Sequence, residues 1–278
     1  MTGRVFTERD VGDFFDQTLS TYLSFWDSEG VLHTGYFADS VADDDYLAAA
    51  ERTSDVLAAD AKIDKSSYVL DVGCGCGNFL IHLAEQYGCR AEGIDLSKER
   101  IKFARNRLTG RDRIKIEFRT GSATRMPYES DAFSHVVSQD ALFLVPDKPR
   151  SYAEIYRVLQ PGGVLAISDF LQPKKEIGER ARKHVYDRVR WSSGYSFVGY
   201  QAALESAGFE IVLARNLERH IRQTYQVLGK TARARAENTS DQSARDWMLD
   251  FSVSCEEIQA AIDNREFGWG IFVAGKRS

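Results

Sequence analysis

From residue 68 onward, short apolar runs alternate with segments of helical character. Strands that are joined through helices in this way run parallel, and a parallel sheet is covered by helices on both of its faces. The pattern therefore predicts a doubly wound α/β fold with a mostly parallel sheet of seven strands. The predicted strands are YVLDVG, AEGID, IKIEF, FSHVVS, VLAISDF, FEIVLA and WGIFVAGK.

A helix with an apolar stripe is predicted ahead of this region. Apolar and aromatic residues recur there at i, i+3, i+4 and i+7, which is the spacing of one helix face. Thr7 and Asp10 precede it with capping-box-like spacing, and Gly30 lies where the helix must already have ended. The stripe has no other obvious core element beside it, so we expect this helix to close over a bound ligand. The residues of the apolar stripe are Val11, Phe14, Phe15, Leu19, Tyr22, Leu23 and Trp26.

Helical sequence also fills most of the chain between the fifth strand and the last. A basic helical stretch lies near 176–190, and further helical sequence runs to about residue 264. Pro161, Gly162 and Gly163 form a turn that leads into VLAISDF. We expect three parts. They are an N-terminal helical lid over residues 1–60, a ligand-binding core over 61–175, and a helical cap with the last sheet strands over 176–278.

Composition excludes several classes of protein. With 278 residues, 43% of them hydrophobic, the chain can bury a large core. No apolar run approaches the ~18 residues of a membrane span, and the first residues lack the apolar core of a signal peptide. The 4 cysteines form no C-x-x-C pair, so we expect reduced thiols and no metal site. We expect a cytoplasmic protein with no membrane partner.

Charge is distributed unevenly along a chain whose formal net charge is -5. Residues 1–60 hold three Lys or Arg against thirteen Asp or Glu, whereas residues 174–235 hold thirteen Lys or Arg against six Asp or Glu. A basic segment inside an acidic protein suits a small anionic ligand better than a nucleic acid, which normally requires a basic domain. A solvated helix face explains the same segment equally well, so both explanations stay open.

The segment DVGCGCGNF, which begins at Asp71, joins a buried strand to a helix and carries three glycines. Glycine lets the backbone turn tightly and approach a ligand, while the N–H groups of the following helix point toward that ligand. A dinucleotide-binding fold would place its third glycine at position 78, where this chain has Asn. Asp95 ends the next strand, eighteen residues beyond Gly77, and is placed to accept hydrogen bonds from ribose hydroxyls.

These motifs resemble those of the class I S-adenosylmethionine-dependent methyltransferases, whose first motif is an acidic residue followed by G-x-G-x-G. The SATRMPY and RVLQPGG segments follow in the family's order, so the resemblance covers about residues 68–169. It implies a Rossmann-like core over residues 61–175 that binds S-adenosylmethionine. The residues that it places at this cofactor are Asp71, Gly73, Gly75, Gly77, Asp95, Leu96, Ser122, Ala123 and Gln139.

Further resemblances concern the methyl acceptor. SQDALFL at 138–144 and the final EFGWGIFVAGK are similar to segments of the sarcosine/dimethylglycine and phosphoethanolamine N-methyltransferases. Tyr22 matches a tyrosine that the phosphoethanolamine enzymes use, but Leu144 replaces its histidine partner. Tyr186 and Arg190 match two of their phosphate-binding residues, and Arg188 and Arg190 would suit a carboxylate equally well.

Two aspartates end strands at the edge where such sheets bind ligands. Asp169, in AISDF, resembles an aspartate that assists the acceptor in natural-product sugar O-methyltransferases, and it could equally cap the following loop. Asp140 could likewise act as a charge stabiliser or as a structural cap. His33, in LHTGYF, resembles the H-x-G-x-Y/F segment of tocopherol-type methyltransferases, and a histidine there packs more often than it reacts.

The sequence therefore predicts transfer of a methyl group from S-adenosylmethionine to a small anionic metabolite, with an amine nitrogen favoured as the acceptor atom. Methyl transfer needs acceptor, methyl and sulfur nearly in line, so positioning can supply much of the acceleration. C-methylation of an isoprenyl diphosphate, for which Mg²⁺ would assist, and O-methylation of a natural product stay open. Monomer and homodimer stay open as well. The candidate catalytic residues are Asp140, Asp169 and Tyr22, and the candidate anion-binding residues are Tyr186, Arg188 and Arg190.

Overall fold

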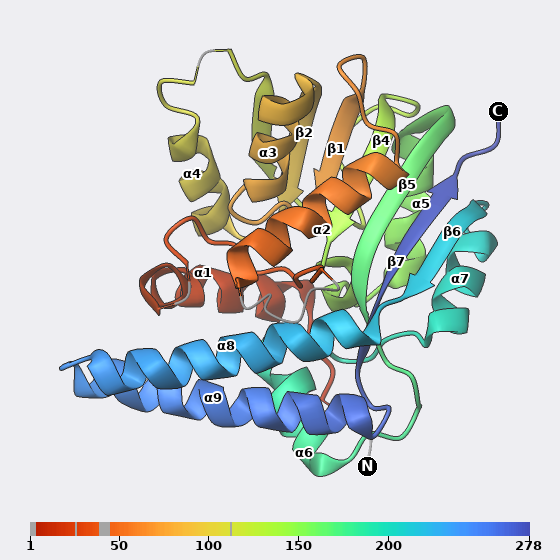
Figure 1. The fold of residues 1–278 in the computed structure, drawn as a ribbon. Helices are drawn as coiled ribbons and strands as arrows, with labels where there is room; N and C mark the ends of the chain where they lie inside the picture. Colours follow the sequence, from red (N-terminus) through yellow and green to blue (C-terminus); the bar gives the residue numbers. More distant parts are fainter. Residues whose placement is uncertain (1–3, 26, 39–44, 112) are drawn as a thin grey trace.

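The computed structural model describes residues 4–25, 27–38, 45–111 and 113–278 and arranges them around one twisted sheet (Figure 1). The described residues form 7 strands in the order β3-β2-β1-β4-β5-β7-β6. The strands run parallel except for β7, which is antiparallel to both of its neighbours, β5 and β6. This topology confirms the predicted doubly wound, mostly parallel, Rossmann-like sheet. The strands are β1 (Tyr68–Val72), β2 (Arg90–Asp95), β3 (Ile116–Thr120), β4 (Phe133–Gln139), β5 (Leu159–Leu171), β6 (Glu210–Asn216) and β7 (Gly268–Gly275).

Helices cover both faces of the sheet, and successive residues of a central strand pack on opposite sides. Val69 of β1 belongs to a core shared with α2, α3 and α4, whereas its neighbour Leu70 belongs to a core shared with α5 and α7. Both side chains are fully buried, as a parallel strand covered on two sides requires. These helices are α2 (Tyr46–Asp60), α3 (Asn78–Tyr87), α4 (Lys98–Arg107), α5 (Lys148–Val158) and α7 (Phe197–Ser206).

The turn that we predicted at 161–163 lies inside β5 rather than before it. Leu159 of β5 pairs with Phe133 of β4, and the next pair joins Val164 to His135. The register thus advances by five residues on β5 and by two on β4, so the Pro-Gly-Gly segment bulges out of the ladder. Gly162 has a φ of 76°, a conformation that glycine adopts without strain. A bulge lets one strand absorb this turn-like segment and then resume pairing.

The N-terminal helix is α1 (Glu8–Phe25), and its first turn forms the predicted capping box. The N–H of Thr7 donates to Asp10 Oδ2 (2.8 Å), and the N–H of Asp10 donates to Thr7 Oγ1 (3.2 Å). The helix packs against α4, where the Arg100 guanidinium lies 4.3 Å from the ring centroid of Phe15. Trp26, which we assigned to the apolar stripe, lies outside the described residues.

Between β6 and β7 the chain forms a long helical hairpin of α8 (Glu218–Asn238) and α9 (Gln242–Asp263). Figure 1 shows the two helices side by side across the lower end of the sheet and extending past it. The basic stretch near 176–190 forms only short helical turns, namely α6 (Glu179–Ala181), η2 (Arg182–Tyr186) and η3 (Asp187–Val189). Within the described ranges, we find no helix with the length and apolar character of a membrane span.

Candidate active site

A cavity of about 190 Å³ lies at the carboxyl ends of β1, β2 and β4. Ligands bind at this edge of open α/β sheets, where the strand order reverses, and here the reversal falls between β1 and β4. Val11 of α1, Tyr46 of α2 and Tyr225 of α8 contribute to its outer wall. The cavity is therefore enclosed by the sheet on one side and by three helices that are far apart in the sequence.

The glycine turn after β1 forms one wall of the cavity. Gly73, Gly75 and Gly77 have φ values of 81°, 52° and 80°, which other residues rarely adopt. A Cβ on Gly73 would collide with Ala141 of the loop after β4. The nearest atom to a Cβ on Gly75 would be Arg100 Nη1 at 3.5 Å, an ordinary contact distance, so no backbone atom crowds this position. Gly73 and Gly75 line the cavity, whereas Gly77 precedes α3 and does not.

Asp95, at the end of β2, is held beside the glycine turn. Its Oδ2 accepts a hydrogen bond from the N–H of Gly75 (2.9 Å), and its Oδ1 accepts one from the N–H of Ser97 (2.8 Å). Burial raises the pKa of Asp95, and the Arg100 guanidinium partly offsets that rise. Asp95 and Leu96 both line the cavity, so the carboxylate oxygens can accept further hydrogen bonds from a ligand.

Two carboxylates of α1 hold this helix over the cavity, and we call their contacts the α1 latch. Glu8 Oε1 accepts a hydrogen bond from Ser122 Oγ (2.6 Å). Asp16 Oδ1 accepts one from Ser97 Oγ (2.6 Å) and one from the N–H of Glu99 (3.2 Å). The latch ties α1 to the loops that follow β2 and β3. Neither carboxylate was identified from the sequence, because their partners lie more than 80 residues away.

The other residues predicted at the cofactor divide between the cavity and its surroundings. Asp71, Ala123 and Gln139 line the cavity, whereas the Ser122 hydroxyl is directed to α1. Burial raises the pKa of Asp71 well above its usual range, and its Oδ1 has no hydrogen-bond partner among the described residues. Gln139 Nε2 donates to Ser54 Oγ of α2 (3.2 Å), so its amide is oriented. We call the part of the cavity lined by the glycine turn, Asp95 and Gln139 the polar half.

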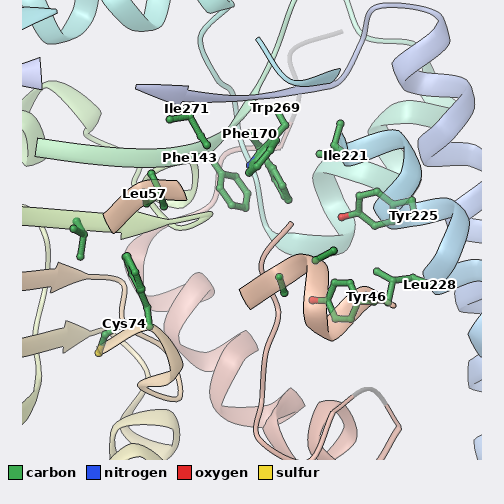
Figure 2. Close-up of a cluster of buried hydrophobic side chains, with 14 of the residues drawn as sticks. Tyr46, Leu57, Cys74, Phe143, Phe170, Ile221, Tyr225, Leu228, Trp269 and Ile271 are labelled. Atoms are coloured by element: carbon green, nitrogen blue, oxygen red, sulfur yellow. The ribbon is translucent and has the colours of Figure 1, made fainter. Parts of the chain in front are cut away.

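Aromatic and aliphatic side chains wall the opposite part of the cavity, which we call the apolar half. Phe143 and Phe170 lie near the end of the sheet with their ring centroids 4.4 Å apart. Figure 2 shows Tyr46, Tyr225 and Leu228 grouped on the other side, on α2 and α8. Sites for small molecules are typically walled in this way, with a few polar groups that orient the ligand.

One cation, Arg188, lines the apolar half. Its Nε donates to the carbonyl oxygen of His184 (3.2 Å), and its guanidinium lies 5.6 Å from the ring centroid of Phe251. Burial acts to lower the pKa of Arg188, but the phenols of Tyr225 and Tyr22 raise it, so the side chain stays cationic. No acidic side chain of the described residues lies within ion-pair distance of it. Because Arg188 stays cationic at the cavity and its guanidinium fork matches carboxylates and phosphates, it suits an anionic ligand.

The structure does not bring Tyr186 or Arg190 to the cavity. The Tyr186 hydroxyl donates to the carbonyl oxygen of Glu266 (2.6 Å) and its ring is fully buried. The Arg190 guanidinium lies 4.9 Å from the ring centroid of Phe14 on α1. Of the three predicted anion-binding residues, Arg188 is the one that lines the cavity in the described part of the chain.

Asp140 lines the cavity and joins the sheet to the segment after α1. Its Oδ2 accepts a hydrogen bond from the N–H of Thr34 (2.6 Å). Its Oδ1 accepts from Ser168 Oγ (3.0 Å) and from Trp269 Nε1 (2.7 Å). Three donors therefore already occupy this carboxylate, which makes it a positioning group for the surrounding backbone.

The remaining candidates differ in their access to the cavity. Tyr22 lines the cavity from α1, as does His33 from the segment after that helix. Asp169 is fully buried, lies outside the cavity lining, and accepts a hydrogen bond from the Tyr200 hydroxyl (2.7 Å). Burial raises the pKa of Asp169 to about 8, so this carboxyl is mostly protonated at neutral pH. Over the described ranges, no three His, Cys, Asp or Glu side chains are grouped as ligands for a metal ion.

Comparison with known proteins identifies the kind of protein that shares these features. Residues 63–190 match the family model described as "Methyltransferase domain". The chain is 27% identical over 278 aligned residues to 27-O-demethylrifamycin SV methyltransferase of Amycolatopsis mediterranei, which is 97% of this chain and 98% of the relative. It is 30% identical to phosphoethanolamine N-methyltransferase 1 of Triticum aestivum over 75% of this chain and 41% of the relative. The chain thus spans less than half of that relative's length.

A solved structure of similar fold is that of a sarcosine dimethylglycine methyltransferase from Galdieria sulphuraria, with a TM-score of 0.84. The alignment covers 94% of this chain and 99% of that one, at 20% sequence identity. At this identity the similarity establishes the fold.

Proposed function

Since the chain belongs to the S-adenosylmethionine-dependent methyltransferases, we propose that it methylates a small, largely apolar molecule that carries an anionic group. The observation that supports this proposal is Arg188, a buried cation that faces the apolar half and has no acidic partner among the described residues. A carboxylate or phosphate of the ligand would provide that partner, because both anions match the guanidinium fork.

The polar half of the cavity fits the methyl donor. Gly75 lines the cavity without a side chain, which allows close approach, and Asp95 can accept hydrogen bonds from the ribose hydroxyls. Gln139 and Ala123 would complete the contact surface. The bound donor supplies a methyl group on a sulfonium sulfur, from which an acceptor atom can displace it. With the α1 latch closed, the helix would exclude water from this half.

The charges around the apolar half bear on the kind of acceptor atom. A protonated amine would need a carboxylate in contact with it, but Asp140 already accepts three hydrogen bonds. Asp169 is mostly protonated at neutral pH, and Arg188 would repel a cation. The amine-nitrogen acceptor that the sequence favoured therefore has less support than a neutral acceptor atom.

One relative aligns along 97% of this chain and 98% of its own length. Its name states that it methylates 27-O-demethylrifamycin SV. The phosphoethanolamine relatives are matched over about half of their length or less, so their substrate is the weaker guide. We infer that the acceptor of this chain is closer to a natural product with an acidic group than to a small amine.

Two measurements test the proposal. Calorimetry with S-adenosylhomocysteine, the demethylated product, should detect binding, and its absence with folded protein would refute the donor site. Radiolabelled donor is then offered with a panel of aromatic and aliphatic carboxylic acids that carry hydroxyl or amine groups. Arg188→Met should raise the acceptor KM about 30-fold or more, the cost of removing one partner of a buried charge pair.

Matched variants sharpen the second measurement. Arg180→Met removes a cation of the same segment that is exposed and paired with Glu257, and its acceptor KM should stay within twofold. Arg190→Met tests the sequence-based prediction for that residue in parallel. If Arg188→Met leaves the acceptor KM unchanged while donor affinity is intact, the anion-binding role of Arg188 is wrong.

A further inference from the structure

We propose that His33 is the catalytic base of this enzyme and that it accepts the proton of a hydroxyl group, so that the methylated atom of the acceptor is oxygen. This inference rests on the methyl transfer proposed above and specifies the chemistry of its acceptor. The observation that supports it is a buried ring nitrogen at the cavity. His33 Nδ1 is buried and has no hydrogen-bond partner among the described residues, and the side chain lines the cavity.

The backbone that carries this ring is held on both sides. The carbonyl oxygen of His33 accepts a hydrogen bond from the Tyr46 hydroxyl (2.9 Å). The N–H of Thr34 donates to Asp140 Oδ2 (2.6 Å), and the carbonyl oxygen of Thr34 accepts from Thr53 Oγ1 (2.7 Å). The backbone that carries the ring is thus attached both to the end of β4 and to α2. Such fixed placement is what a catalytic group needs, because small displacements reduce the rate strongly.

An unpaired nitrogen inside the protein needs a physical explanation. A buried polar atom without a partner costs about 1–3 kcal/mol, so most such atoms are paired. In the tautomer that carries its proton on Nε2, Nδ1 is an acceptor, and a hydroxyl group of the ligand would donate to it. Nδ1 of His33 would then be paired only when the acceptor is bound.

The surroundings of His33 keep its ring able to take up a proton. Burial lowers the pKa of His33, the carboxylate of Asp140 and an interaction with the Thr34 backbone partly offset this, and His82 of α3 lowers it further. The other charged and titratable side chains that line the same cavity are Glu8, Tyr22, Tyr46, Asp71, Cys74, Cys76, Asp95, Arg100, Arg188 and Tyr225. A ring with a lowered pKa is neutral at pH 7, and Asp140 stabilises the imidazolium once it forms.

The proposed step conserves atoms and charge. The acceptor oxygen forms a bond to the methyl carbon while the bond between that carbon and sulfur breaks. The electron pair of the broken bond stays on sulfur, which becomes a neutral thioether. The hydroxyl proton passes to Nδ1 of His33, and the imidazolium later releases it to solvent. A hydroxyl needs such a base because it is a weak nucleophile while it keeps its proton.

Kinetics on the whole 278-residue chain test the assignment with a matched pair of acceptors. Para-hydroxycinnamate and para-aminocinnamate share a carboxylate for Arg188 and differ in the atom to be methylated. We expect label from the donor in the hydroxy compound. His33→Gln should lower kcat by about 10²- to 10⁴-fold, the usual contribution of a general base, and should leave the Kd of S-adenosylhomocysteine unchanged. His135→Gln is the control, because His135 contacts Ser134 and Ala61 instead of the cavity.

The pH profile and a titration separate this inference from the proposed function. The wild-type kcat/KM should fall on acidification as His33 becomes protonated, and His33→Gln should lose that acidic limb. Label in aminocinnamate but not in hydroxycinnamate overturns the inference and leaves the proposed function intact. If neither compound is labelled, the proposed anion-bearing acceptor is contradicted, and the NMR titration described next tests the role of His33 by itself.

The NMR measurement uses protein saturated with S-adenosylhomocysteine, and the His33 ring signal is assigned by its absence in His33→Gln. We expect a neutral ring at pH 7 whose signal shifts with hydroxycinnamate and not with cinnamate, which lacks the hydroxyl. A ring that is protonated at pH 7, or that responds equally to both compounds, overturns the inference.

Discussion

Removing one carboxylate of the α1 latch should weaken cofactor binding while the sheet stays folded. Asp16→Ala deletes the acceptor of two hydrogen bonds, from Ser97 Oγ at 2.6 Å and from the N–H of Glu99 at 3.2 Å. A hydrogen bond to a charged group contributes about 1.5–3 kcal/mol. Because Asp16 is half-buried and the second bond is long, we assign about 2 kcal/mol to the pair. If latch closure and binding are coupled, the Kd of S-adenosylhomocysteine rises about 30-fold.

Calorimetry with S-adenosylhomocysteine measures this change directly. Asp13→Ala is the matched control, because Asp13 lies on the same helix, is exposed, and forms an ion pair with Arg9 one turn earlier. Circular dichroism and thermal unfolding show whether each variant keeps its fold. If Asp16→Ala and Asp13→Ala bind the product equally well, α1 does not act as a lid, and the function that we assign to its latch is wrong.

Three further outcomes follow from single side chains. Arg188→Met should lower the melting temperature of the ligand-free protein, since the raised pKa means that the fold stabilises this cation and the substitution also removes its hydrogen bond to the carbonyl oxygen of His184; an unchanged or higher value in scanning calorimetry would contradict this. Burial raises the pKa of Asp169 to about 8, so the contribution of this carboxyl to stability is complete below pH 3.8 and is lost as the pH rises toward 8. The melting temperature of Asp169→Asn relative to wild type should therefore increase between pH 5 and 8. If the melting temperatures of the two proteins change in parallel with pH, the shift is refuted. Gly73→Ala should abolish binding of S-adenosylhomocysteine because its Cβ meets Ala141, whereas Gly110→Ala, with an equally positive φ but open space around it, should keep binding.

The polar half of the site could be predicted from the sequence because its parts are close together along the chain. The glycine turn and Asp95 lie within 25 residues of each other, and each follows a strand that its apolar run already identifies. What they contribute is backbone shape and one carboxylate, both of which depend on residue type and local order. The strands and the capping box at Thr7 and Asp10 were predictable for the same reason.

The turn at 161–163 shows where local reasoning stops. The Pro-Gly-Gly composition correctly indicated a break in regular structure, and Gly162 has the positive φ that such a break requires. Whether the chain leaves the sheet there depends on the strand beside it. Leu159 pairs with Phe133 before the break, so the segment becomes a bulge within β5.

The apolar half is built from contacts that no local pattern encodes, and its chemistry follows from them. Asp140 follows β4 and Asp169 lies two residues before the end of β5, at the same edge of the sheet, and residue type and position alone do not separate them. Trp269 and Thr34, 129 and 106 residues away from Asp140, supply the donors that occupy its carboxylate. Tyr200 instead meets Asp169 in a place closed to the cavity, where burial keeps that carboxyl protonated at neutral pH. With neither carboxylate placed to contact an ammonium group of the ligand, and with Arg188 lining the cavity, the cavity should select a neutral acceptor atom on an anionic molecule.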